Sequence, residues 1–438
     1  MDLPSHSPSA PLAWRWVPTL YFCEGVPYVV AMTVSVVLYK NLGVSNTDIA
    51  FYTSWLYLPW VIKPLWSPLV DLLRTKRSWI FSLQFVIGAA LGLLALAVPG
   101  PFFFRTTLAI FWLLAFSSAT HDIAADGFYL LALPPHLQAA FVGVRSTFYR
   151  LAMIAGQGGL VFLAGSLQES LGDARRAWAG VFFLLAALFV LAGSYHLFVL
   201  PRPAGDHPAG HTQRPMAEFL SVFASFFRKR DIKFILAFLL LYRLAEAQVL
   251  KLVAPFLLDG RASGGLGLTT RQVGLLYGTI GITALLLGGL VGGYTISRFG
   301  LRRLLWPMLI SMHLPIVVFV FLALVQPSSI ALIGGALTVE QFGYGFGFTA
   351  YMVYMMMVSV GEHRTAHYAI CTGFMALGMM LPGLPAGWIQ ERLGYVGFFI
   401  WACIATIPSF AAAALISIEA NYGRKSPLSA LGGAPSRQ

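Results

Sequence analysis

Charged residues are scarce in this sequence of 438 residues: Asp, Glu, Lys and Arg make up 11% of it, and 58% is hydrophobic. Soluble proteins average about 25% charged residues, so ordinary soluble domains are excluded and a multi-pass membrane protein is indicated. Acidic residues are the rarest class, with 17 Asp and Glu against 29 Lys and Arg, which gives a net charge of +12. The basic residues lie mainly between apolar runs, where they orient a membrane protein, so we expect no nucleic-acid partner.

Cysteine is also scarce, with three residues in the chain. Cys23, Cys371 and Cys403 lie in apolar runs without a CxxC spacing, so the sequence indicates neither a disulfide framework nor a metal site. We expect no cofactor. Catalytic signatures such as HExxH, a P-loop or a Rossmann glycine pattern have no supporting context here, so we expect no enzyme. The alternative from another class is a membrane-embedded enzyme with metal ligands such as Glu362 and His363, or the histidine and carboxylates described below.

Apolar runs of about 20 residues, the length that spans a bilayer, dominate the sequence. They predict an all-α membrane protein with twelve transmembrane helices in two six-helix bundles, at 16–39, 47–70, 78–98, 106–131, 138–165, 177–200, 232–257, 271–295, 304–324, 329–355, 365–388 and 394–417. A polar stretch rich in proline and basic residues separates the sixth run from the seventh. The predicted parts are therefore a tail, a bundle, a linker, a second bundle and a second tail, at 1–15, 16–200, 201–231, 232–417 and 418–438.

Lys and Arg are distributed unevenly between alternate loops. The side of the membrane that holds both tails and the linker also holds two basic clusters, at 74–77 and 298–303. Loops rich in Lys and Arg tend to remain in the cytoplasm. We therefore expect both termini and the linker to be cytoplasmic.

A short pattern recurs at the ends of predicted helices. It consists of a glycine, a polar residue four positions later and a second glycine after three more, and it occurs at Gly165-x3-Glu169-x2-Gly172, Gly293-x3-Ser297-x2-Gly300 and Gly387-x3-Glu391-x2-Gly394. The second helix offers a degenerate copy, Ser67-x3-Asp71. Since the pattern returns every three helices, it predicts a three-helix unit used four times, with alternate copies inverted.

Two carboxylates and an imidazole interrupt the fourth apolar run at Asp122, Asp126 and His121. An ionised side chain near the bilayer centre costs at least about 2.5 kcal/mol, so it normally faces a protein interior or a water-filled cavity and has a partner. Asp122 and Asp126 are four residues apart and share a helical face. From their depths along the helices, we expect Asp126 to pair with Arg145 and Asp122 with Arg150.

Two interpretations of these charges remain open. They form a structural ion-pair lattice, or one carboxylate is a proton site, because an acid beside a cation titrates when that cation moves away. We expect Asp126 and Arg145 to be structural, and Asp122 to couple protons with Arg150 as its partner and His121 as a relay. Hydrogen bonding alone is the other explanation for His121.

Other charged residues are distributed over several predicted helices. Glu24 lies beside a break at Gly25-Val26-Pro27, and interrupted helices point to substrate sites. Lys63 is near enough to the interface to snorkel, so we expect structural roles for it and for Asp71. In the second half, we expect Glu340 to pair with Arg243 across two helices. We expect Glu24, His121, Arg150, Arg243 and Glu340 to converge in a central cavity between the halves. The expected substrate site in that cavity comprises Glu24, Tyr149, Arg150, Arg243, Glu246, Glu340, Gln341 and Tyr344.

Several short motifs resemble the AmpG-type permeases, the muropeptide branch of the peptide/acetyl-CoA transporter group within the major facilitators. They cover most of both halves: Glu24-Gly25-Val26-Pro27, Lys63-Pro64-Leu65-Trp66-Ser67-Pro68-Leu69-Val70-Asp71, Ser117-Ser118-Ala119-Thr120-His121-Asp122-x3-Asp126, Tyr149-Arg150-Leu151, Tyr242-Arg243-Leu244-Ala245-Glu246, Val339-Glu340 and Ala366-His367-Tyr368-Ala369. The resemblance implies a symporter of the bacterial inner membrane that imports anhydromuramyl peptides for cell-wall recycling, driven by the proton gradient. We expect it to be a monomer.

Two positions depart from the family pattern. His121 and His367 stand where the permeases tend to have glutamine, so an amide becomes a titratable imidazole at both. Related permeases of this group move siderophores or acyl-CoA, and a cationic, aromatic-rich cavity suits either of them. The solute therefore stays open between a muropeptide and another anionic compound.

Overall fold

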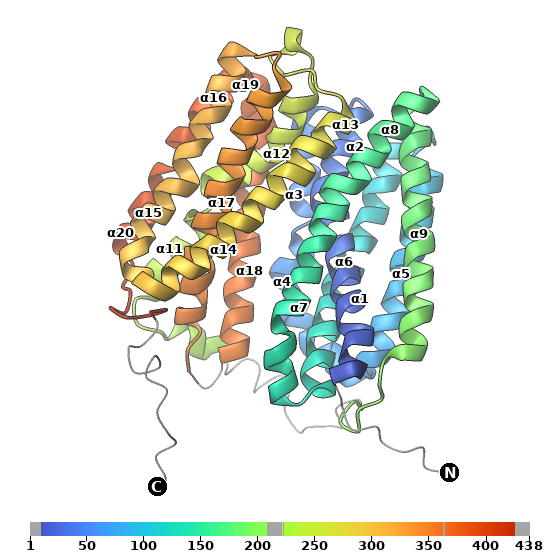
Figure 1. Ribbon diagram of the computed structural model, residues 1–438, viewed down its shortest axis with the longest axis vertical. Coiled ribbons are helices and arrows are strands. Elements are labelled where there is room, and N and C mark those ends of the chain that lie inside the picture. Colours follow the sequence, from blue (N-terminus) through green and yellow to red (C-terminus); the bar gives the residue numbers. More distant parts are fainter. Residues whose placement is uncertain (1–9, 208–220, 222, 362–363, 425–438) are drawn as a thin grey trace.

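The computed structural model describes residues 10–207, 221, 223–361 and 364–424 (Figure 1). Most of the first tail, part of the linker, Glu362, His363 and most of the second tail lie outside the described residues, as does the side chain of Asp71. All regular secondary structure in the described ranges is helical.

Six spans form the N-terminal bundle. The first span is nearly continuous through a π-helical turn, the second is broken at Leu56 and Tyr57, and the fifth contains a second π-helical segment. The elements are α1 (Ala10–Val29), η1 (Val30–Val34), α2 (Ser35–Asn41), α3 (Asn46–Trp55), α4 (Leu58–Leu73), α5 (Lys76–Ala97), α6 (Phe103–Ala132), α7 (Pro135–Met153), η2 (Ile154–Leu160), α8 (Val161–Leu171) and α9 (Ala174–Val199).

The C-terminal bundle has a break and a π-helical segment in other spans. Its first span is broken at Tyr242 and Arg243, and its second again contains a π-helical segment, η4. The elements are α11 (Ile232–Leu241), α12 (Leu244–Leu258), η3 (Arg261–Ser263), α13 (Thr270–Val273), η4 (Gly274–Gly281), α14 (Ile282–Phe299), α15 (Leu301–His313), η5 (Leu314–Ile316), α16 (Val317–Val325), α17 (Ile330–Val358), α18 (Arg364–Gly383), α19 (Ala386–Ile404) and α20 (Ile407–Leu415).

The positions of the helices agree closely with the predicted spans. Eight helical stretches in the described residues are long and apolar enough to cross a membrane. Four more helical stretches, α3–α4, α11–α12, α17 and α18, lie where the second, seventh, tenth and eleventh spans were predicted. Most spans are a few residues longer than predicted, because polar residues at their ends continue the helix.

The two bundles lie side by side in Figure 1, with α1–α9 in blue to green and α11–α20 in yellow to red. The first turn of α1 and the last turn of α20 are at the same end of the molecule. Across the interface, α3 packs against α19, α4 against α18, and η2 against η4. The second span thus meets the eleventh, and the fifth meets the eighth.

The recurring glycine pattern has a clear structural meaning. Its last glycine ends a helix with φ of 65° at Gly172, 84° at Gly300 and 66° at Gly394, a conformation that favours glycine. Gly394 therefore separates the eleventh span from the twelfth inside α19. The first glycine differs between copies: a Cβ on Gly387 would meet the backbone of Asn46 in the opposite bundle, whereas a Cβ on Gly293 would have no atom within 4 Å.

Candidate functional site: charged side chains between and within the bundles

Asp122 lies on α6 and faces α4. One Asp122 oxygen accepts a hydrogen bond from Trp60 Nε1 at 3.0 Å and lies 3.5 Å from Lys63 Nζ. The other oxygen is buried without a hydrogen-bond partner. The predicted pair with Arg150 is therefore wrong, because the cation beside Asp122 is Lys63. Lys63 consequently has a specific carboxylate partner in addition to any access to the interface.

Asp126 forms the pair that its depth predicted. Arg145 Nη2 lies 2.9 Å from Asp126 Oδ1, and the Tyr21 hydroxyl donates to the same oxygen at 3.2 Å. The guanidinium also lies 4.5 Å from the ring centroid of Tyr21 and 5.2 Å from that of Tyr129. These contacts connect α1, α6 and α7.

His121 faces the interior of the N-terminal bundle and not the interface between bundles. It is fully buried, and its Nε2 lies 3.1 Å from Gln84 Nε2 on α5. The oxygen of Gln84 meets His196 Nδ1 on α9 at 2.8 Å, and His196 Nε2 meets the Thr19 hydroxyl at 3.0 Å. As the amide is placed, Gln84 donates to His121 and accepts from His196. The expectation that His121 lines the central cavity is therefore wrong, and its contacts are those of the hydrogen-bonding alternative.

Glu24 is buried on α1, and one of its carboxylate oxygens has no hydrogen-bond partner. The glycine beside it allows close packing, since a Cβ on Gly25 would lie 3.0 Å from the Tyr149 carbonyl oxygen on α7. The predicted break is milder than an interrupted helix: α1 continues through Pro27 into the π-helical turn η1.

Arg243 lies at the break between α11 and α12. It forms a buried ion pair with Glu246, with Nη2 3.1 Å from Oε1, and it donates to the Tyr344 hydroxyl at 2.5 Å. Its guanidinium lies 4.7 Å from the ring centroid of Phe348. Glu340 instead accepts a hydrogen bond from its neighbour Gln341 at 2.8 Å. The predicted pair between Arg243 and Glu340 is therefore wrong, because Glu246 compensates the arginine.

Arg150 points from α7 toward the opposite bundle. Its Nη1 approaches Gly289 of α14, and it has no ion pair within the described part of the chain. Its side chain is only half-buried, so water can solvate the charge. Of the predicted cavity residues, Arg150 is thus one with a direct contact across the interface.

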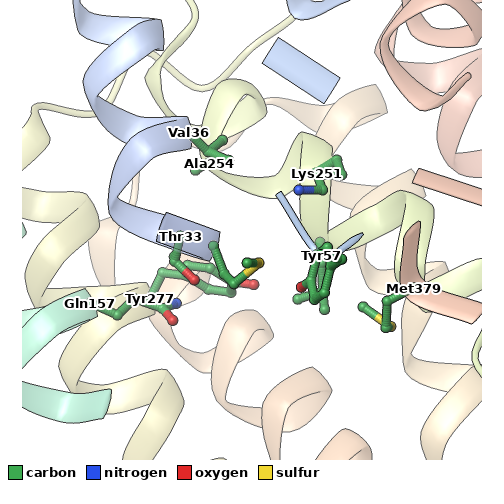
Figure 2. Close-up of a pocket in the computed structure, with 10 residues that line it drawn as sticks. Thr33, Val36, Tyr57, Gln157, Lys251, Ala254, Tyr277 and Met379 are labelled. Atoms are coloured by element: carbon green, nitrogen blue, oxygen red, sulfur yellow. The ribbon is translucent and has the colours of Figure 1, made fainter. Parts of the chain in front are cut away.

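Lys251 is a buried intramembrane lysine at the interface between the bundles. It is 3% exposed on α12, donates to Thr53 Oγ1 of the other bundle at 3.0 Å and lies 5.1 Å from the ring centroid of Tyr57. Figure 2 shows it at a cavity of about 50 Å³ between the bundles. The sequence signal was a lysine in an apolar run, but its contacts depend on segments about 200 residues away.

One end of the molecule is tied across the interface; we call it the tied end, defined by the loops 42–45, 172–173 and 259–269. Lys40 Nζ lies 2.7 Å from Asp259 Oδ1, and Glu391 accepts two hydrogen bonds from Thr47. Further contacts across this end join Asn46 to Gln390 and Tyr395, Thr270 to Asn41 and Gln168, and Arg271 to Glu169.

In the described residues, no group of three His, Cys, Asp or Glu side chains is placed to hold a metal ion.

Comparisons with known proteins agree with this architecture. The family model of the Major Facilitator Superfamily matches residues 19–359. The chain is 27% identical over 397 residues to the anhydromuropeptide permease of Escherichia coli (strain K12), covering 89% of this chain and 76% of that protein. It is 26% identical over 404 residues to the putative transporter AmpG 4 of Rickettsia conorii, covering 88% and 92%.

Solved transporters share the arrangement of helices. The nucleoside transporter NupG has a TM-score of 0.69 at 16% identity, covering 93% of this chain and all of that one. A bacterial homologue of the human lysosomal transporter Spinster, in an inward-facing conformation, has a TM-score of 0.68 at 16% identity, covering 96% and 100%. At these identities the likeness concerns the fold, which is the two-bundle fold predicted from the sequence.

Proposed function

This chain belongs to the Major Facilitator Superfamily and is a multi-pass membrane transporter, and on that premise we propose that it imports anhydromuropeptides together with protons. The observation that carries the proposal is the alignment with the anhydromuropeptide permease, which extends over 89% of this chain. Aromatic and cationic side chains at the interface suit a solute with sugar rings and carboxylates.

We also propose an orientation in the bacterial inner membrane. The basic clusters at 74–77 and 298–303 lie at the end of the molecule opposite the tied end. Since basic loops favour the cytoplasm, the tied end faces the periplasm and both termini face the cytoplasm. The contacts of the tied end then hold the periplasmic side closed.

For the coupling site we propose Asp122. Its second oxygen is buried without a partner, and Lys63 at 3.5 Å is at the long end of ion-pair distances. A proton on that oxygen removes the charge and releases Lys63, so protonation changes the contact between α4 and α6. Asp126, held by Arg145 and Tyr21, is the structural carboxylate in this proposal.

The test is uptake of labelled anhydromuropeptide into cells that lack their own permease, with Asp122→Asn as the key variant. We expect wild type to accumulate the solute, and Asp122→Asn to lose accumulation while it still exchanges internal for external solute, because binding remains and titration is lost. Glu419→Gln, at an exposed carboxylate after α20, is the matched control and should accumulate normally. Uptake of a siderophore with no uptake of muropeptide contradicts the proposed solute. Normal accumulation by Asp122→Asn, with loss in Glu24→Gln or Glu340→Gln, contradicts the proposed coupling site.

A further inference from the structure

Lys251 is a buried cation that has no carboxylate partner among the residues that the structure describes. Three other cations in the bundles have carboxylate partners: Lys63 has Asp122, Arg145 has Asp126, and Arg243 has Glu246. Arg150 has no ion pair among the described residues, but its side chain is only half-buried, so water can reach the guanidinium. Lys251 is 3% exposed and has no carboxylate within ion-pair distance in the described chain.

An uncompensated ammonium at this depth is costly. Moving an ion from water into a protein interior without a counter-charge costs on the order of several kcal/mol. The hydroxyl of Thr53 and the ring of Tyr57 stabilise the ammonium, but neither supplies a negative charge. Such a group is therefore well suited to receive an anion.

The cavity beside Lys251 has the chemistry of an anion site. Its polar lining comes from both bundles, with Thr33, Tyr57 and Gln157 from one and Lys251 and Tyr277 from the other. Figure 2 shows the Lys251 nitrogen directed into the space above the Tyr57 ring, with Gln157 and Tyr277 on the far side of the cavity. Hydroxyl and amide groups can donate hydrogen bonds to an anion alongside the ammonium.

A polar group next to Lys251 lacks a hydrogen-bond partner. The Ser54 hydroxyl is fully buried and makes no hydrogen bond. Ser54 and Lys251 meet at the same place, because both approach Gly383 of α18, where a Cβ would lie 2.6 Å from Ser54 Oγ and 3.5 Å from Lys251 Cε. Glycine at 383 thus leaves room for these two side chains.

The size of the cavity limits what it can hold. A volume of about 50 Å³ exceeds the roughly 10 to 15 Å³ that a cavity needs to hold one water molecule. A carboxylate group or a halide therefore fits. Lys251 is eight residues beyond Arg243, or about 12 Å along a helix at 1.5 Å per residue, so the two cations define separate positions.

We propose that this cavity is an anion site in which Lys251 binds a carboxylate-sized acidic group between the two bundles. Two sources share this chemistry: a carboxylate of the transported solute, or a small inorganic anion such as chloride. The solute source rests on the proposed function, whereas the anion site itself does not. Since Lys251 contacts Thr53 of the opposite bundle, an anion bound here neutralises the interface and stabilises the closed tied end.

The first experiment needs no transport. The melting temperature of the purified full-length protein is measured with acetate, with chloride and with acetamide, at constant ionic strength set by a bulky sulfonate. We expect acetate or chloride, but not neutral acetamide, to raise the melting temperature, and Lys251→Met to abolish that rise. Lys233→Met, at an exposed lysine on α11, is the control and should keep it. An equal response of wild type and Lys251→Met to the anions overturns the proposal.

The second experiment identifies the source of the anion. Uptake is compared for anhydromuropeptide with free peptide carboxylates and for the same compound with those carboxylates amidated. If the solute supplies the anion, Lys251→Met raises the half-saturation concentration for the acidic compound about tenfold or more, in line with a charged hydrogen bond, and leaves that for the amidated one unchanged. If chloride supplies it, uptake by wild type depends on chloride and uptake by Lys251→Met does not. If Lys251→Met takes up both compounds equally poorly, and uptake by wild type does not depend on chloride, the result counts against the anion site. Absence of uptake by wild type, together with an anion-dependent melting temperature, refutes the proposed function and leaves the site standing.

Discussion

Asp259→Asn should weaken the tied end, where Asp259 joins the two bundles. The Asp259 carboxylate lies 2.7 Å from Lys40 Nζ and accepts from the Tyr395 hydroxyl at 2.5 Å. The side chains of Lys40 and Asp259 are 15% and 21% exposed, so the pair is neither fully buried nor fully solvated. Asn at this position keeps an acceptor for Tyr395 and loses the ion pair.

The magnitude follows from this partial burial. Exposed ion pairs contribute about 0 to 1 kcal/mol, whereas breaking a buried pair costs about 3 to 5 kcal/mol. We place the loss between these limits, at about 1 to 2 kcal/mol, which changes an equilibrium ratio roughly 5- to 30-fold. The ratio of molecules with the tied end closed to those with it open should fall by that factor.

The assay is the distribution of distances between spin labels at Phe102→Cys and Ser328→Cys, two exposed loop positions in opposite bundles. The three native cysteines are replaced by alanine in this background. The control is Arg271→Gln, which breaks an ion pair with Glu169 whose side chains are 51% and 47% exposed. We expect Arg271→Gln to change the ratio by only a few-fold, in keeping with a contribution of about 0 to 1 kcal/mol.

A double variant separates the ion pair from other effects. If the Lys40–Asp259 contact is the cause, the double variant Lys40→Met with Asp259→Asn should change the free energy of opening by less than the sum of the two single changes. Additive shifts, or an Asp259→Asn ratio no different from that of Arg271→Gln, would refute the reasoning.

Two further predictions concern packing and topology. Gly278→Ala should lower the melting temperature by several degrees, because its Cβ would lie 2.6 Å from Gly158 Cα and overpacking costs about 1 to 3 kcal/mol; Gly159→Ala, with no atom within 4 Å of its Cβ, should not. For the proposed orientation, an alkaline phosphatase fused after the C-terminus should be inactive, since that enzyme is active only in the periplasm; a strongly active fusion would reverse the orientation.

The spans were predictable because a bilayer imposes a simple length rule on apolar sequence. Their ends were less so: the fifth span was expected at 138–165 and extends from Pro135 to Leu171. The polar residues that the apolar criterion excluded are compatible with helix, and Gly172 provides the stop. The glycine pattern likewise located the stops at Gly300 and Gly394 without any knowledge of tertiary contacts.

The error at Arg150 has a geometrical cause that the sequence already contained. Depth along a helix is one coordinate, and direction around it is another. Arg145 and Arg150 are five residues apart, which at 3.6 residues per turn places them about 140° apart around α7. If Arg145 faces Asp126, then Arg150 must face elsewhere, and it approaches Gly289 of the other bundle.

The same reasoning applies to His121. Consecutive helical residues are separated by about 100°, so His121 cannot share the direction of Asp122. With Asp122 directed at Lys63, the imidazole turns toward Gln84. The identity of that partner was not predictable, because it depends on how α5 and α9 pack against α6.

The charges that remain unpaired inside the bundles bear on the proposed transport. In each of three ion pairs, the two partners neutralise each other's charge. Among the described residues, two carboxylates and two cations inside the bundles have no oppositely charged partner: Glu24, Glu340, Arg150 and Lys251. A buried carboxylate without a cation is most easily neutralised by a proton, and a buried cation without a carboxylate by an anion. The unpaired groups therefore match the two species that a proton-coupled importer of an acidic solute has to carry. This also explains why Glu24→Gln and Glu340→Gln belong beside Asp122→Asn in the uptake experiment: each removes one proton-accepting group and leaves the cations in place.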